Sequence, residues 1–237
     1  MIPYILKGLV LPERAAISLG PMKMEFFHPS SGLEAQAKLN IVLNQITVWV
    51  YSEHEWDIFD LRNVAEQLVV DILAIVGFLK GYAYNVEIRQ IINDGKDIDY
   101  VFGINMPCIE KRNEHLDFEK HLNKLLPKVA GDHGIFIKRC LNDLVMAMKQ
   151  PGDTGFYCFR AIEALKQYCK NRYGLEKEAD QWKKVSDISG YGKDHIEVVR
   201  RFAFPARHGD ILPITSSDRE EIFIKAWDIV EAFLENA

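Results

Sequence analysis

The chain has 237 residues, of which 48% are hydrophobic and 27% are charged, a balance typical of a globular protein and not of a disordered or fibrous one. Its 29 lysines and arginines stand against 34 aspartates and glutamates, and the net charge of -5 excludes a protein that coats nucleic acid through bulk positive charge. A chain of this length can bury enough surface to fold without disulfides or a structural metal.

The first predicted elements are two strands of a hairpin. Apolar residues alternate over 39–43, and a run rich in β-branched and aromatic residues follows over 46–51. Trp49 and Tyr51 alternate with two valines, so they share one face of their strand. That face is either a platform on which bases stack or part of the core against the next helix.

A long helix is predicted next. Apolar residues recur at helical spacing from Leu61 to Leu79, with Asp57 or Asp60 available as the N-terminal cap and Gly81 as the C-terminal stop. We expect this helix to pack on the sheet.

A second hairpin is predicted where the segments 86–92 and 98–104 flank Asp94-Gly95, a dipeptide that tolerates the positive φ angles of a tight turn. The two hairpins and the helix predict an α+β domain over residues 1–110, built from a small antiparallel sheet and one long helix. No motif assigns a role to this domain.

From about residue 115 the apolar period changes to 3.6 residues, which predicts helices only. Six are expected, at 117–128, 134–149, 154–173, 179–188, 193–204 and 217–235. Ser217 and Glu220 have the spacing of a capping box for the last of them. The charged segment 107–113 is the expected connector, so the second domain is predicted to be an all-helical bundle over 111–237.

Several signatures of catalytic and metal sites are missing. His54 lies among acidic residues, but no second histidine follows one helical turn away, so this segment is predicted to be a solvated turn. The glycine-rich segment 190–193 follows no strand and lacks the spacing of a phosphate-binding loop. Cys108 has no base near it in the sequence. We therefore predict no metal and no other cofactor, and we find no DNA-specific motif.

The cellular location is predicted from the lack of secretory and membrane-spanning signals. The N-terminus lacks the basic start, apolar run and cleavage site of a secretory signal. The most apolar stretch, 68–79, contains Asp71 and is shorter than the roughly 20 residues that span a bilayer. The four cysteines form no CxxC pair and are expected to be reduced and mostly buried. We expect a cytoplasmic protein that contacts no membrane.

One short segment concentrates positive charge in this acidic chain. Within nine positions it carries Arg200, Arg201, Arg207 and His208. In one interpretation these side chains form an anion site. In the other, the arginines pair with acidic neighbours and His208 caps a helix end, where a cation is favourable.

Helical geometry bears on this cluster. Arg201 and His208 are seven residues apart, which places them two turns apart on nearly the same face of a continuous helix. Pro205 lies between them, and its ring clashes with the carbonyl of Arg201. We therefore expect the helix to kink or end near Phe204.

An arginine followed after six residues by His208-Gly209 at a helix end, with an earlier helix reading FRAIEALKQY over 159–168, resembles the HEPN superfamily. The resemblance covers roughly residues 115–237. HEPN domains are helical bundles, and many are metal-independent endoribonucleases that cut as dimers in toxin, abortive-infection and antiviral systems. The resemblance implies that Arg201 and His208 are catalytic and that Glu163 faces Arg201 as a third catalytic residue. Arg200 and Arg207 are then expected to bind the substrate.

The function expected from this resemblance is binding or cleavage of RNA by a homodimer, in a toxin or antiviral setting. An arginine can hold two phosphate oxygens and a histidine can serve as base or acid near neutrality, whereas one such pair does not easily fill every role. The same groups would also bind RNA or a nucleotide without cleaving it. The alternative is a non-catalytic dimerisation or interaction module with a degenerate motif, which Phe202 and Pro205 favour.

Overall fold

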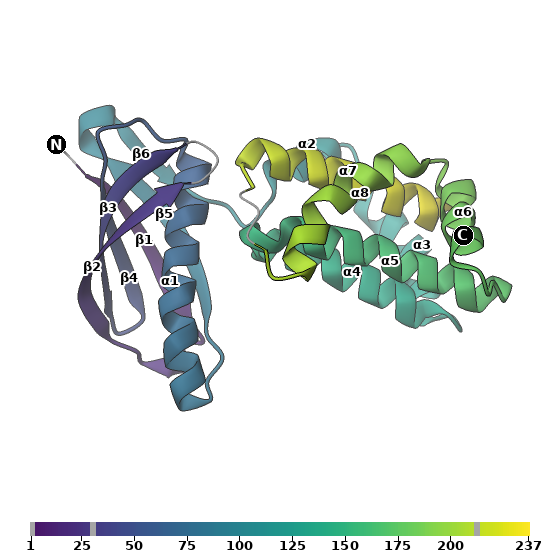
Figure 1. Ribbon diagram of the computed structural model, residues 1–237, viewed down its shortest axis with the longest axis horizontal. Helices are drawn as coiled ribbons and strands as arrows, with labels where there is room; N and C mark the ends of the chain where they lie inside the picture. The colour runs from purple at the N-terminus through teal and green to yellow at the C-terminus, as the bar shows by residue number, and fades with distance from the viewer. Residues whose placement is uncertain (1–2, 29–31, 211–213) are drawn as a thin grey trace. The chain divides into compact units, whose positions relative to one another are not determined.

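In the computed structural model, the chain forms two compact units, Met1–Ile104 and Asn105–Ala237. The structure describes residues 3–28, 32–210 and 214–237. The first unit is a sheet with one long helix and the second is made of helices (Figure 1). The predicted α+β fold class is confirmed.

The first unit contains a six-stranded antiparallel sheet in the order β2-β3-β4-β1-β5-β6. Its strands are β1 (Tyr4–Leu11), β2 (Leu19–His28), β3 (Leu33–Val42), β4 (Gln45–Tyr51), β5 (Asn85–Asn93) and β6 (Ile98–Val101). The two predicted hairpins are present as β3–β4 and β5–β6. The prediction missed β1 and β2. Strand β1 is central and apolar almost throughout, so it shows no alternation, whereas β2 does alternate over 22–26 and was overlooked.

Helix α1 (Ile58–Lys80) covers one face of this sheet (Figure 1). Leu61 and Val69 of α1 are buried in one core with Val48 and Val50 of β4. The carboxylate of Asp57 accepts hydrogen bonds from two backbone N–H groups of the first turn, and Gly81 ends the helix with a φ of 69°. The predicted helix and both of its ends are confirmed.

The β3–β4 turn is held by the side chain of Asn44. This buried residue has a φ of 69°, a left-handed conformation that asparagine tolerates better than most residues. Its side-chain oxygen accepts from the Ile17 N–H at 2.7 Å, and its amide donates to the Glu13 carbonyl at 2.7 Å. The hydrogen bonds fasten the β1–β2 connection to the hairpin.

The β5–β6 turn differs from the tight turn that was predicted at Asp94-Gly95. Asp94–Lys96 forms a turn of 3-10 helix, and Asp97 is the residue with a positive φ, at 53°. The strands pair from Asn93 and Ile98, which leaves room for this longer turn. Strand β6 ends at Val101, three residues before the expected end at Ile104.

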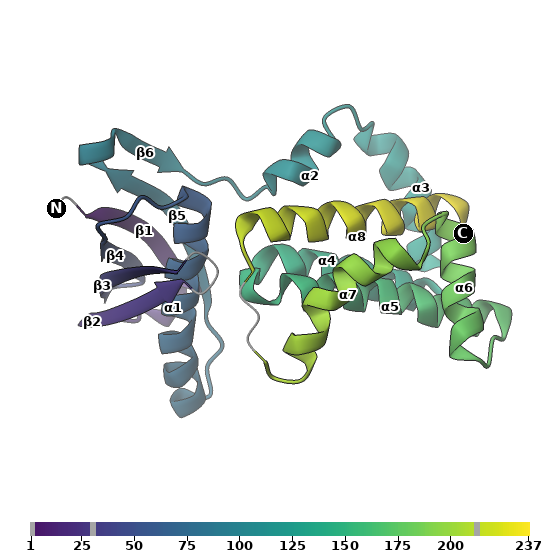
Figure 2. The same cartoon turned by 45° about the horizontal axis from the view of Figure 1, so that its top comes forward.

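The second unit contains seven α-helices among the described residues (Figure 2). They are α2 (Pro107–Arg112), α3 (Phe118–Ala130), α4 (Gly134–Lys149), α5 (Thr154–Tyr173), α6 (Glu178–Ser189), α7 (Lys193–Arg207) and α8 (Ser216–Asn236). All six predicted helices are present. Helix α5 contacts α4, α6, α7 and α8, and its Ile162 and Leu165 are fully buried in the core of the bundle.

Helix α2 occupies the segment that was predicted to be a charged connector. Pro107 stands at the first helical position, where its missing N–H is not needed, and Ile109 is buried in the helical core. Arg112 binds Asp228 at 2.8 Å and Glu231 at 2.6 Å, both on α8. The expected domain boundary at residue 110 therefore falls inside α2, and the helical unit begins at Asn105.

Two helix ends in this unit also differ from expectation. The capping box of α8 consists of Thr215 and Asp218, so Ser217 and Glu220 are not its members. Helix α7 continues through Pro205 to Arg207 and does not end at Phe204. A proline in the last turn removes only one helical hydrogen bond, and its own carbonyl accepts from the His208 N–H at 2.9 Å, which closes the helix.

The cysteines are free, as predicted, and three of the four are buried. Burial raises the pKa of the Cys140 and Cys158 thiols, and it raises the pKa of Cys169 to about 11. These three thiols are therefore protonated and unreactive near neutral pH. Of the helices that the structure describes, none has both the length and the apolar content to cross a membrane.

Candidate functional site

The clustered arginines lie on the solvent side of α7. The opposite side of this helix is buried in the bundle through Ile196, Val199, Phe202 and Ala203. Because apolar residues at helical spacing turn one side of α7 inward, the residues between them face outward. We use the name α7 surface for its exposed residues Arg200, Arg201, Phe204, Arg207 and His208.

Each arginine of the α7 surface binds one carboxylate. The pairs are Arg200 with Glu197 at 3.2 Å, Arg201 with Glu221 of α8 at 2.8 Å, and Arg207 with Glu163 of α5 at 3.2 Å. His208 is the residue that ends α7. The structure therefore shows the second interpretation of the sequence: the arginines pair with acidic neighbours, and His208 caps the helix. Exposed ion pairs of this kind contribute only about 0–1 kcal/mol to stability, so a competing anion can displace them.

Aromatic rings complete the α7 surface. Phe204 is 53% exposed, and its ring centre lies 4.6 Å from that of His208. The Arg200 guanidinium lies 5.9 Å from the centre of the Phe204 ring, and that of Arg201 lies 4.8 Å from the Phe202 ring. Phe204 was not among the predicted site residues. It stands three residues after Arg201 and four before His208, and this spacing of one helical face is the signal that could have identified it.

The structure does not bring the three predicted catalytic residues together within one chain. Arg201 and His208 lie on the same helix, separated by about 10 Å along its axis. Glu163 was expected to face Arg201, but it binds Arg207. The reason is rotational: Arg201 and Arg207 are six residues apart and therefore point about 120° apart around α7, toward α8 and α5 respectively.

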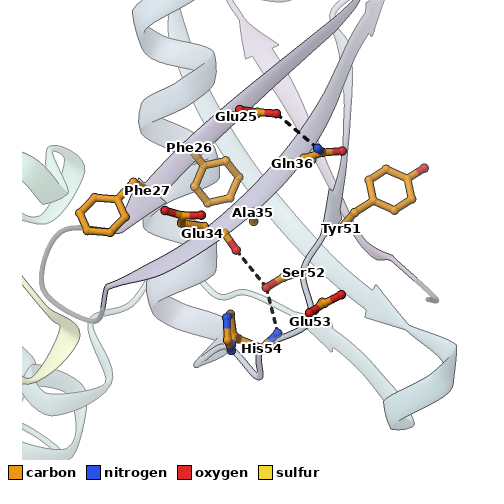
Figure 3. Close-up of a pocket in the computed structure, with 10 residues that line it drawn as sticks. All are labelled: Glu25, Phe26, Phe27, Glu34, Ala35, Gln36, Tyr51, Ser52, Glu53 and His54. Atoms are coloured by element: carbon orange, nitrogen blue, oxygen red, sulfur yellow. Dashed lines mark hydrogen bonds between the residues drawn. The ribbon is translucent and has the colours of Figure 1, made fainter.

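A separate hollow of about 600 Å³ lies in the first unit, where β2, β3 and β4 meet the segment after β4 (Figure 3). It is lined by Glu25, Phe26, Phe27, Glu34, Ala35, Gln36, Tyr51, Ser52, Glu53 and His54. Gln36 donates to the Glu25 carboxylate at 3.3 Å and the Ser52 hydroxyl donates to the Glu34 carbonyl at 3.2 Å. Three glutamates make this hollow unsuitable for a phosphate, and no predicted site residue lines it.

His54 lies in an exposed turn between β4 and α1, as predicted. Within the described ranges, no three histidine, cysteine or acidic side chains gather as they would to hold a metal ion. The α7 surface is therefore the site that the sequence singled out and the structure exposes.

Comparison with known proteins places both units in one family. A model described as the N-terminal domain of a domain of unknown function (DUF8168) matches residues 4–102, and the model of its C-terminal domain matches residues 122–237. No curated protein and no solved structure matches the chain significantly.

Proposed function

The chain belongs to the DUF8168 family, and from its surfaces we propose that it binds RNA through the α7 surface and cleaves it without a metal when two copies join. The observation that carries this proposal is the gathering of three arginines, one histidine and an exposed aromatic ring on one side of α7. The resemblance to HEPN domains supports the same assignment.

RNA binding follows from the chemistry of these side chains. Arginine presents a planar fork of donors that matches two phosphate oxygens, and such bidentate contacts are stronger than ordinary hydrogen bonds. A phosphate can therefore replace the carboxylates of Glu197, Glu221 or Glu163. The exposed rings of Phe204 and His208 lie beside the arginines, where a base can stack on them.

Cleavage requires a second copy. A base must take the 2′-hydroxyl proton, an acid must protonate the leaving 5′-oxygen, and a cation must stabilise the charge that develops on the phosphate. Each α7 surface has one histidine, so one chain does not supply both base and acid. When two α7 helices pair antiparallel about a two-fold axis, Arg201 of each copy lies next to His208 of the other. The separation of about 10 Å within one chain is then no obstacle.

The first test is cleavage of a mixed RNA pool in EDTA at low salt. The native protein is expected to cut, and Arg201→Ala is expected to cut at least about tenfold more slowly because the phosphate loses a bidentate cation. Arg139→Ala, which changes an exposed arginine on α4, serves as the matched control and should cut like the native protein. Equal loss in both variants, or full activity in Arg201→Ala, would contradict the assignment.

A second prediction concerns Glu163, which the resemblance made catalytic. Glu163→Gln removes a negative charge and frees Arg207, so RNA binding is expected to strengthen about two- to fivefold at low salt. The measurement is fluorescence anisotropy of a labelled oligonucleotide, with Glu197→Gln, which frees Arg200, as the comparison. If Glu163→Gln instead abolishes cleavage and leaves binding unchanged, Glu163 acts in the chemistry and not as a competitor of the phosphate.

The second candidate function is a protein interaction module. The observation that favours it is that the chain already neutralises each arginine of the α7 surface, while Phe204 remains exposed. In that case Phe204→Ala changes the oligomeric state measured by light scattering, and neither the native protein nor any variant binds RNA. Retention of RNA binding together with a dimer would favour the nuclease.

A further inference from the structure

The sheet of the first unit has a second face that α1 does not cover. Val48 and Val50 of β4 are fully buried on the α1 side. Because neighbouring residues of a strand point to opposite faces, Trp49 and Tyr51 point to the other side. The sequence left open whether these aromatic residues form a platform or pack against the helix, and the structure turns them away from α1.

Strand register shows what surrounds Trp49 on this face. Lys38 of β3 and Ile5 of β1 are its cross-strand partners, and Lys23 of β2 is the partner of Lys38. The Lys38 ammonium lies 5.0 Å from the centre of the Trp49 ring. In the next row of the same face, Lys7 of β1 pairs with Thr47, two residues before Trp49. We call Lys7, Lys23, Lys38, Trp49 and Tyr51 the open sheet face.

Charge on this face is arranged asymmetrically. The row through Trp49 contains two lysines and a single carboxylate, Asp99, at the distant edge on β6. Glu25 is the cross-strand partner of Gln36 in the row of Tyr51, and Glu34 lies one row further from Trp49. Both glutamates line the hollow beside Tyr51 (Figure 3). A polyanion is therefore attracted to the rows of Trp49 and Lys7 and repelled from the hollow.

We propose that the open sheet face binds single-stranded RNA, with a base stacked on Trp49 and the adjoining phosphates held by Lys7, Lys23 and Lys38. A flat ring offers a stacking partner only to an unpaired base, which makes single strands the ligand and excludes duplexes. Stacking of a base on an aromatic ring is stronger than an exposed ammonium contact with that ring. The base therefore displaces the Lys38 ammonium, which then reaches the neighbouring phosphate.

This proposal rests on the proposed function in that RNA is the ligand, and it adds that the bound RNA is single-stranded. It adds a second stacking contact, in the N-terminal unit, and makes no demand on the α7 surface. The two surfaces can therefore be tested by separate variants of the full chain.

The experiment titrates the full-length protein with a twelve-nucleotide oligouridylate at low salt and follows both tryptophan fluorescence and anisotropy of a labelled oligonucleotide. The native protein should show quenching, and Trp49→Leu should lose the quenching and bind at least about tenfold more weakly. Trp49→Phe keeps a ring, so it should retain most of the affinity. Circular dichroism establishes that each variant is folded.

The lysines are tested by salt dependence. The double variant Lys23→Gln/Lys38→Gln should lower the slope of log affinity against log salt by about 1.4, since each phosphate contact to a single strand contributes about 0.7. Lys120→Gln/Lys124→Gln on α3 removes two exposed charges elsewhere and serves as the matched control. An equal change in both double variants would overturn the assignment.

The outcomes distinguish the two proposals. If Trp49→Leu binds RNA like the native protein while Arg201→Ala loses cleavage, the open sheet face is wrong and the α7 surface stands. If Arg201→Ala loses cleavage while RNA still quenches its tryptophan fluorescence, the proposals for the α7 surface and for the open sheet face both stand. If Trp49→Leu dissociates a dimer without affecting RNA binding, the face binds a second copy of the chain and the proposal is overturned. Absence of any RNA binding by the native protein overturns both.

Discussion

Replacement of His208 by alanine is expected to slow RNA cleavage at least about 100-fold, because general acid–base catalysis contributes about this much or more. His208 is exposed at the end of α7, beside Phe204 and on the same helix as Arg201. In a two-fold pair it supplies both the base and the acid, one from each copy. The variant should still bind RNA, since Arg200, Arg201 and Arg207 remain.

The other histidine of the same helix provides the control. His195 stands near the start of α7, where its ring contacts Tyr191 and lies 3.4 Å from the Lys225 ammonium. His195→Ala should therefore cut RNA at a rate within about twofold of the native rate. Single-turnover rates in EDTA, measured on variants shown to be folded, make the comparison. Full activity of His208→Ala would remove this residue from the chemistry and leave RNA binding as the function of the α7 surface.

Replacement of Gly155 by alanine is expected to lower the free energy of unfolding of the helical unit by about 3 kcal/mol. At Gly155, helix α5 passes so close to α7 that an added Cβ would lie 2.6 Å from the Phe202 Cβ and 2.9 Å from the Phe202 carbonyl carbon. Backbone atoms line this contact, so the two helices must move apart. Phe202 is next to Arg201, and the shift would also displace the α7 surface.

The matched control for this variant is Gly192→Ala, at the residue that precedes α7. No atom lies within 4 Å of a Cβ built there, and its φ of -80° suits any residue. Gly192 is the N-cap of α7, where glycine is preferred over alanine, so we expect a loss of only about 1 kcal/mol. Urea unfolding should be followed with probes in each unit, because the two units can unfold in separate transitions. A Gly155→Ala protein as stable as Gly192→Ala would mean that α5 and α7 are not in close contact.

Local sequence patterns predicted most of the helical unit. Helices α4 and α5 have the predicted bounds, because a 3.6-residue apolar period and the breaks at Pro151 and Gly174 depend only on neighbours in the chain. Strand β1 escaped prediction because its apolar character comes from its central position, between β4 and β5. Helix α2 escaped because its charges pair with α8, more than a hundred residues later, which no local pattern reveals.

The α7 surface and the open sheet face likewise depend partly on local sequence and partly on tertiary packing. The sequence by itself determined that Arg200, Arg201, Arg207 and His208 share one short segment and that Trp49 and Tyr51 share one strand face. Only the tertiary structure decided that Glu221 binds Arg201, that Glu163 binds Arg207, and that α1 covers the valine face of β4. Periodicity states which residues lie on the same side of an element, whereas the packing of distant elements selects the side that remains exposed to solvent.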